Sequence, residues 1–197
     1  MDKQSILYQL TEKTSGYLLV REAVSLGISR PTIASFIKKQ SMQKIAFGIY
    51  KTEEAWDDPW FVLQSQYQET IFSGATALYL HGLLDRELCV ITVTVKKGYN
   101  TLSLHRKKIK TYYTDPQLLS MGVISMDTPF SHYVNVYDMD RSICDLIQHK
   151  NDFDIQDFQK ALKGYFHSPS KNIHQLMKYA SKLNMEQKIR HYMEVLL

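Results

Sequence analysis

The stretch SGYLLVREAVSLGISRPTIASFIKKQ, residues 15–40, decides the fold of the N-terminal part of the chain. Apolar residues recur at helical spacing on both sides of Gly27, where a helix end favours a residue that tolerates the left-handed conformation. Ser29 is a natural helix N-cap, and Pro31 suits the first turn because its missing N–H is not needed there. The stretch therefore predicts two short helices joined by a tight corner.

The two predicted helices each have an apolar stripe, but the second also has a polar, basic face. The first stripe is Leu19, Ala23, Val24 and Leu26, and the second is Ile33, Phe36 and Ile37. A corner followed by a helix that starts with short polar residues is typical of a helix-turn-helix. This pattern predicts DNA contacts from Ser29, Arg30, Thr32, Ser35, Lys38 and Lys39.

The next segment, MQKIAFGIYKT at residues 42–52, changes its period. Ile45, Phe47 and Ile49 alternate with more polar or smaller residues, which predicts a β-hairpin that turns near Phe47 and Gly48. A hairpin directly after a recognition helix is a wing, which contacts the phosphate backbone or the minor groove.

The positive charge of the chain is concentrated in this N-terminal part. The 197 residues have a formal net charge of +4, yet residues 1–51 hold eight basic and three acidic residues, a net of +5, which leaves −1 for the remainder. Taken alone, a pair such as Lys38–Lys39 is more often a solvated helix face. The cap, the glycine corner, the hairpin and the charge asymmetry together favour double-stranded DNA as a partner.

Composition and cysteine usage indicate a globular protein outside the membrane. The hydrophobic fraction is 44% and the charged fraction 22%, and no apolar run approaches the ~18 residues that a membrane span requires. The first residues lack the pattern of a signal peptide. Cys89 and Cys144 stand alone in apolar surroundings, which predicts buried thiols in a reducing cytoplasm.

Three segments of the chain resemble the AbiEi-like antitoxins, which are repressors of type IV toxin-antitoxin operons linked to phage abortive infection. The first runs from Gly16 through VREAVSLGISRPTIASFIKKQSMQKIAFGIYKT; the others are FSGATALYLHGL at 72–83 and VYDMDRSICDLI at 136–147. The resemblance implies a winged helix that binds inverted repeats in its own promoter. It also implies a nucleotidyltransferase-like toxin as functional partner, opposed without a stable complex. The family typically has a basic residue before the wing glycine, whereas this chain has Phe47, so Lys44 and Lys51 become the expected phosphate contacts of the wing.

The expected fold class is α+β, with a winged helix-turn-helix at 1–55 and a mixed α/β domain at 56–197 that ends in amphipathic helices. Asp57, Asp58 and Pro59 open the second part with a helix near 60–67, and Ser73 can cap a following helix that stops at Gly82. The expected strands are 89–97, 108–114, 123–127 and 132–138. Three apolar stripes beginning at Ile155, Ile173 and Ile189 predict the terminal helices.

A second basic segment, KKGYNTLSLHRKKIK at 96–110, contains no acid. It could lie along flanking DNA or meet an acidic partner, or it could be a hairpin with solvated charges. Its basic residues are Lys96, Lys97, Arg106, Lys107, Lys108 and Lys110.

No arrangement in the sequence points to catalysis, a metal or a cofactor. The histidines form no metal-ligand motif, and no glycine-rich phosphate loop is present. Asp138, Asp140 and Asp145 form the only acidic cluster in the sequence that resembles a nuclease site. The structural interpretation is favoured: Asp138 or Asp140 caps a helix, and Arg141 pairs with Asp145 one turn later.

The sequence thus predicts a DNA-binding repressor that is also an antitoxin, and not an enzyme. Two alternatives stay open. One is an ordinary winged-helix regulator whose C-terminal domain senses a ligand or dimerises. The other is a nuclease or transferase domain at the C-terminus.

Overall fold

The computed structural model describes residues 2–86 and 88–196 and has a mixed α+β architecture. The chain divides into two compact units. The first runs to Gln68 and also includes Met126–Val134. The second comprises Glu69–Ser125 and continues from Asn135 to the C-terminal helix.

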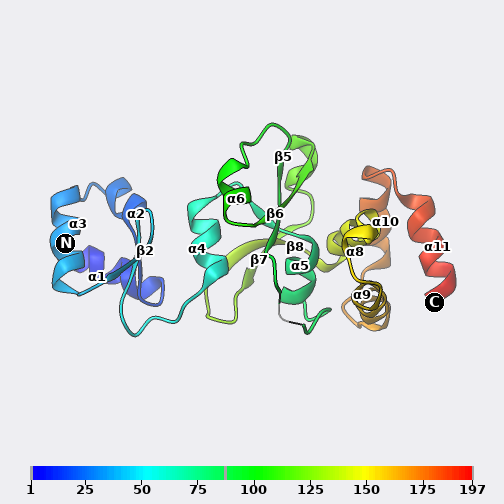
Figure 1. Ribbon diagram of the computed structural model, residues 1–197, viewed down its shortest axis with the longest axis horizontal. Coiled ribbons are helices and arrows are strands. Elements are labelled where there is room, and N and C mark those ends of the chain that lie inside the picture. The colour runs from blue at the N-terminus through cyan, green and yellow to red at the C-terminus, as the bar shows by residue number, and fades with distance from the viewer. Residues whose placement is uncertain (1, 87, 197) are drawn as a thin grey trace. The chain divides into compact units, whose positions relative to one another are not determined.

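The first unit combines small helices with a three-stranded antiparallel sheet in the order β1-β3-β2. Its core contains Leu7, Leu18 and Phe36, all fully buried. In chain order its elements are α1 (Lys3–Lys13), β1 (Tyr17–Leu19), α2 (Val20–Ser25), α3 (Arg30–Lys39), β2 (Gln43–Ala46), β3 (Ile49–Lys51) and α4 (Pro59–Gln66) (Figure 1).

The glycine corner between α2 and α3 is confirmed. Gly27 has a φ of +78°, and its N–H donates to the carbonyl of Val24 at 2.9 Å. The N–H of Ile28 then donates to Ala23 at 3.1 Å, which completes the helix end. The expected stripe of α2 is partly wrong, because Val24 and Leu26 are exposed. Ala23 and Ile28 are the buried residues beside the corner.

Strand β1 was not predicted. Tyr17, Leu18 and Leu19 are all buried, so they show no alternation, and a short apolar run cannot be distinguished from the start of a helix by its period. The strand pairs with β3 in the register Leu18 to Tyr50. It thereby anchors the hairpin formed by β2 and β3.

A buried hydrogen bond between the side chains of Asp58 and His132 joins the segment 126–134 to the rest of the first unit. The Oδ2 atom of Asp58 lies 2.8 Å from Nδ1 of His132 and accepts the hydroxyl proton of Thr128 at 2.5 Å. Nε2 of His132 lies 3.1 Å from the carbonyl oxygen of Thr14. One ring nitrogen therefore faces a carboxylate and the other a backbone carbonyl. The ring also stacks on Phe61, with centroids 4.2 Å apart.

These contacts explain why the first unit extends beyond the expected boundary at residue 55. The hydroxyl of Tyr17 donates to the carbonyl of Trp56 at 2.8 Å, and Arg21 donates to the carbonyl of Ser65. Asp58 also caps α4 by accepting the N–H of Phe61 at 3.0 Å. Residues 56–68 are therefore part of the first unit, and the chain enters the second unit at Glu69.

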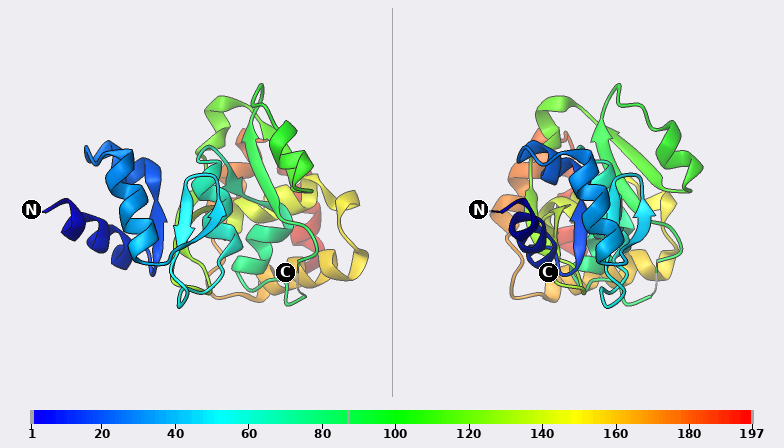
Figure 2. Two further views of the ribbon diagram at one scale, coloured as in Figure 1. Left: turned by 60° about the vertical axis from the view of Figure 1, so that its left-hand side comes forward. Right: turned by 90° about the vertical axis from the view of Figure 1, so that its left-hand side faces the viewer.

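A mixed sheet in the order β6-β5-β4-β8-β7 has most of its residues in the second unit. Strand β4 pairs antiparallel with β5 and parallel with β8, and β5 pairs parallel with β6 (Figure 2). The elements from Glu69 onward are β4 (Ile71–Phe72), α5 (Gly74–Leu80), β5 (Thr92–Lys96), α6 (Leu102–Arg106), β6 (Lys110–Thr114), α7 (Pro116–Leu119), β7 (Val123–Asp127), β8 (Tyr133–Tyr137), α8 (Met139–Gln148), a 3-10 turn (Lys150–Asp152), α9 (Ile155–His167), α10 (Ile173–Lys182) and α11 (Glu186–Leu196).

Helix α8 is the centre of the second unit. It packs on α5, α9, α10 and α11, and Figure 1 shows it between α5 and the last three helices. Ile143, Cys144 and Leu146 are fully buried within it. The expected strands and the three terminal helices are present, whereas β4, α6 and α7 are too short to have been read from their patterns.

Helix α5 approaches the sheet closely through Gly74. Its φ is +51°, and an added Cβ would lie 3.0 Å from Cγ2 of Thr92. Ser73 precedes the helix as expected, but its side chain makes no capping bond. Its hydroxyl oxygen instead accepts from Thr94 at 2.8 Å, which ties the helix start to β5.

The two cysteines differ, against the expectation that both are buried. Cys144 is fully buried in α8, and burial raises its pKa to about 12. Cys89 is exposed. The apolar neighbours of Cys89 in sequence lie in the segment before β5, where they do not enclose it.

We expect Asp58→Ala to lower the free energy of unfolding by about 3 kcal/mol, because the buried side chains of Thr128 and His132 lose their common acceptor and α4 loses its cap. Chemical denaturation followed by circular dichroism measures the effect. The matched control is Asp57→Ala, whose side chain is 80% exposed and pairs with Lys51, and whose loss should cost less than about 1 kcal/mol. Equal effects of the two substitutions would contradict the role given to Asp58.

Candidate nucleic-acid interface

The N-terminus of α3 is built as the sequence predicts. The Oγ of Ser29 accepts the N–H of Thr32 at 3.4 Å and also lies 2.8 Å from the Thr32 hydroxyl. Pro31 stands in the first turn. The hydroxyl of Thr32 is thus engaged with the cap and the residue is half-buried, so Thr32 offers less to a ligand than its neighbours.

The two sides of α3 differ sharply in polarity. Ile33 and Phe36 are buried at 2% and 0% exposure and pack on the core formed with α1 and β1. The helix contains no acidic residue. Its exposed polar side chains are Ser35, Arg30, Lys38 and Lys39, with the exposed cap Ser29 before them.

The hairpin after α3 is present with the expected turn at Phe47–Gly48. Lys44 is exposed on β2, opposite Tyr50 of β3. Phe47 stands at the tip with 90% of its surface exposed, next to Gly48 at a φ of +69°. The tip is therefore apolar, and the basic character of the hairpin comes from Lys44 on its flank.

Lys51 does not fit the expected role of phosphate contact. Its side chain is only 10% exposed, and its Nζ donates to the carbonyl of Ala55 at 2.9 Å and lies 2.8 Å from Asp57. Sequence alone could not show this, because the acceptors come from the loop after β3. The ammonium ties that loop to the hairpin.

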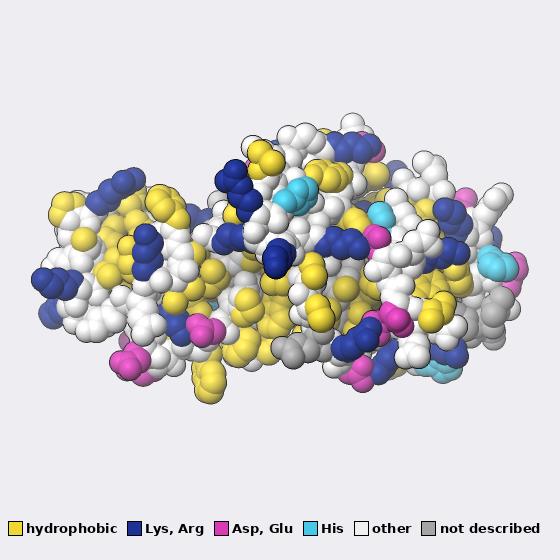
Figure 3. Space-filling model, viewed as in Figure 1, with side chains coloured by type: hydrophobic (Ala, Val, Ile, Leu, Met, Phe, Trp, Pro, Cys, Tyr) yellow, Lys and Arg dark blue, Asp and Glu magenta, His cyan; other side chains and the backbone are white. Residues whose placement is uncertain are grey.

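Lysine and arginine side chains are spread over the surface formed by α2, α3 and β2 (Figure 3). Helix α3 and strand β2 contribute four exposed basic residues: Arg30, Lys38, Lys39 and Lys44. Nucleic acid backbones carry dense negative charge, so such a surface favours their approach.

The basic segment 96–110 is partly neutralised by acids from elsewhere in the second unit. Lys96 pairs with Glu69, Lys97 with Asp115 at 2.7 Å, and Lys110 with Asp152 at 3.1 Å. Arg106, Lys107 and Lys108 are exposed at the end of α6. The segment includes α6 and is not a simple hairpin, and its acid-free sequence does not make an acid-free surface.

The acidic cluster has the structural roles that the sequence favoured. Asp138 caps α8 by accepting the N–H of Arg141 at 2.7 Å, and Asp145 accepts from Nε of Arg141 at 3.0 Å. Asp140 is buried and accepts from the hydroxyl of Tyr165 at 2.6 Å. Across residues 2–86 and 88–196, no group of three histidine, cysteine or acidic residues is placed to hold a metal ion. Within the same ranges, no helix has the length and apolarity needed to cross a membrane.

Comparison with known proteins informs the fold alone. No protein-family model matches the chain, and no curated protein matches it. Among solved structures, it is similar to the crystal structure of the RV2827C protein from Mycobacterium tuberculosis, with a TM-score of 0.59 and 12% sequence identity. The match covers 89% of this chain and 70% of that chain. At this identity the likeness shows a shared fold and carries no activity from one chain to the other.

We expect Lys51→Ala to destabilise the first unit by about 1–2 kcal/mol, because the buried carbonyl of Ala55 loses its charged donor. Lys44→Ala is the matched control; it removes an exposed lysine from the same hairpin and should change stability by less than about 0.5 kcal/mol. Thermal or chemical unfolding measures the stability of the two variants relative to the parent chain. A loss for Lys44→Ala as large as for Lys51→Ala would contradict this division.

Proposed function

We propose that the chain is a DNA-binding repressor whose first unit acts as a winged helix-turn-helix. The observation that carries the proposal is the exposed side of α3. It bears three basic side chains and no acid, it follows a capped corner, and it precedes a hairpin with an exposed lysine. A packing helix needs no such face, whereas a recognition helix does.

The proposed contacts divide by chemistry. Arg30 and Ser35 lie early enough on α3 to reach base edges in the major groove, where an arginine reads guanine and a serine reads several bases. Lys38, Lys39 and Lys44 supply phosphate contacts. Phe47 gives the wing an apolar tip, which suits the sugar and base edges of a minor groove better than a phosphate.

We further propose that the chain is the antitoxin of its own operon and opposes a nucleotidyltransferase-like toxin. The support is the resemblance of three segments to the AbiEi-like antitoxins. The second and third segments form β4–α5 and β8–α8, which supply buried residues such as Leu78 and Ile143. The resembling residues are therefore mainly those that build the core, which favours a common scaffold for the second unit.

Neutralising Lys38 and Lys39 together should flatten the salt dependence of DNA binding. Each lost phosphate contact reduces the slope of log K against log salt by about 0.9, so the double variant K38Q/K39Q should lose about 1.8. The slope is measured by fluorescence anisotropy on promoter and random duplexes. Salt is varied between roughly 50 and 200 mM, where phosphate contacts change the affinity strongly.

Two variants serve as controls for this measurement. The double variant K163Q/K178Q removes the same two charges from exposed lysines of the second unit that lie outside the basic segment 96–110, and it should leave the slope unaltered. Ser35→Ala should weaken binding to the promoter by roughly fivefold and leave random DNA unaffected, because it removes a base contact only. An unchanged slope in K38Q/K39Q would show that these lysines are merely solvated.

The antitoxin proposal requires a nucleotidyltransferase-like toxin gene directly downstream, and it is tested with the full-length chain in cells that express that toxin. We expect the K38Q/K39Q variant to protect as well as the parent chain while it fails to repress a promoter reporter, since the two activities are proposed to use different units. Survival after toxin induction and reporter output are measured in parallel. If the parent chain does not protect cells from the toxin, the antitoxin proposal is wrong, whereas the DNA-binding proposal is unaffected.

A further inference from the structure

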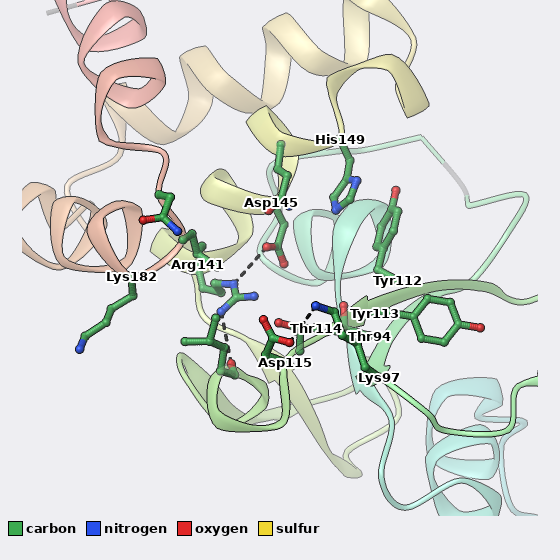
Figure 4. Close-up of a pocket in the computed structure, with 14 residues that line it drawn as sticks. Thr94, Lys97, Tyr112, Tyr113, Thr114, Asp115, Arg141, Asp145, His149 and Lys182 are labelled. Atoms are coloured by element: carbon green, nitrogen blue, oxygen red, sulfur yellow. Dashed lines mark hydrogen bonds and ion pairs between the residues drawn. The ribbon is translucent and has the colours of Figure 1, made fainter.

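The second unit contains a polar pocket of about 200 Å³ (Figure 4). The ends of β5 and β6, the start of α7, one side of α8 and the C-terminal end of α10 enclose it. Its volume is smaller than the ~300–1,000 Å³ of pockets that take drug-sized ligands. A compact polar ligand therefore fits it better than a large apolar one.

The guanidinium of Arg141 forms the floor of this pocket. Its side chain is 3% exposed, Nε donates to Asp145 at 3.0 Å, and one terminal nitrogen donates to the carbonyl of Leu118 at 3.4 Å. Its Cζ atom lies over the ring of Tyr137, 4.5 Å from the ring centre. The other terminal nitrogen has no protein acceptor among the described residues, and Figure 4 shows the guanidinium directed into the pocket.

A buried guanidinium with an unused N–H group is costly unless something accepts from it. Asp145 compensates the charge but lies to one side of the guanidinium, and burial raises the pKa of this carboxyl although Arg141 opposes the rise. The remaining N–H groups are therefore available to a ligand or to water.

Two further donors converge on the same space. Lys97 reaches in from the end of β5, where its Nζ pairs with Asp115 at the mouth, and Figure 4 shows this Nζ directed to the centre. His149 borders the pocket one turn after Asp145 and stacks on Tyr112, with ring centres 4.0 Å apart and planes inclined by 13°. Burial lowers the pKa of His149, so the neutral ring offers one N–H.

The stack is held from outside the pocket. The hydroxyl of Tyr112 donates to Asp152 at 2.8 Å, and Lys110 pairs with the same carboxylate. The ring of His149 is thereby fixed in orientation, while neither of its nitrogens bonds to another described residue of the protein.

We propose that this pocket binds the phosphate group of a small ligand, with Arg141, Lys97 and His149 as the contacting residues. Three donors that approach from different sides match a tetrahedral oxyanion, and a guanidinium edge is well suited to phosphate oxygens. A phosphate within a nucleic acid backbone carries a sugar on both sides, so a terminal phosphate reaches a recessed guanidinium more readily. The inference is independent of DNA binding by the first unit.

The experiment titrates the full-length protein with inorganic phosphate at constant ionic strength, followed by isothermal calorimetry and by phosphorus NMR line width. We expect saturable binding of one phosphate per chain. Arg141→Lys should weaken it by about tenfold or more, because the charge remains but the planar donor edge is lost. Circular dichroism melting confirms that each variant is folded.

Two variants keep the proposal testable if Arg141→Lys fails to fold. Lys97→Gln and His149→Phe should each weaken phosphate binding by roughly fivefold, and phenylalanine preserves the stack on Tyr112. The matched control is Lys182→Gln: Lys182 also borders the pocket, but Figure 4 shows its ammonium directed away. This control should change the affinity by less than about twofold.

Three results would overturn the proposal. Heat and line width that match a chloride titration at equal ionic strength would show that no phosphate site exists. Equal losses of phosphate affinity in Lys97→Gln and Lys182→Gln would show that phosphate responds only to the net charge of the protein. Displacement of phosphate by oligonucleotides that lack a terminal phosphate would make the pocket part of a nucleic-acid surface.

Discussion

The carboxylate of Asp58 is the constraint on which the first unit depends. It caps α4, accepts the hydroxyl of Thr128 and is hydrogen-bonded to Nδ1 of His132, all without exposure to water. Because His132 also reaches the carbonyl of Thr14, one buried group connects the end of α1, the start of α4 and the segment 126–134. The candidate recognition helix is therefore carried by a scaffold that includes residues from the middle of the chain.

The sequence predicts local structure well where the physics is local. The Ser29 cap, the Gly27 corner, the turn at Gly48 and the pair of Arg141 with Asp145 each depend on residues within a few positions, and each is present. Strands β1 and β4 could not be predicted from the sequence. They consist of three and two buried residues, and such short runs have no detectable period. The exposed side of α3 was predicted because its alternation with the buried stripe is itself local.

What the sequence could not show depends on partners that are distant along the chain. In the sequence, Lys51 cannot be distinguished from an exposed lysine. It is buried because the loop after β3 brings Asp57 to its ammonium group. The basic segment 96–110 gains Glu69 and Asp152 only through the fold. The pocket could not be predicted for the same reason. The sequence shows only that Arg141 can pair with Asp145 on one helix. The residues of β5, β6 and α10 that complete the cavity around Arg141 are distant along the chain. The spacing of Arg141, Asp145 and His149, each one turn apart, was the available signal.

The discontinuity of the first unit has a consequence for biosynthesis. Its helices α1 to α4 leave the ribosome early, but the acceptors at Asp58 and Thr14 meet His132 only after 64 further residues beyond Gln68 have been made, as 132 minus 68 shows. At roughly 5–20 residues per second, this delay amounts to about 3–13 seconds. During that interval Asp58 lacks its partners Thr128 and His132, and strands β4 to β7 are translated before the first unit is complete. The first unit is complete at Val134, whereas the second still lacks α8 to α11 at that point, and neither unit can be released by cutting the chain at one place.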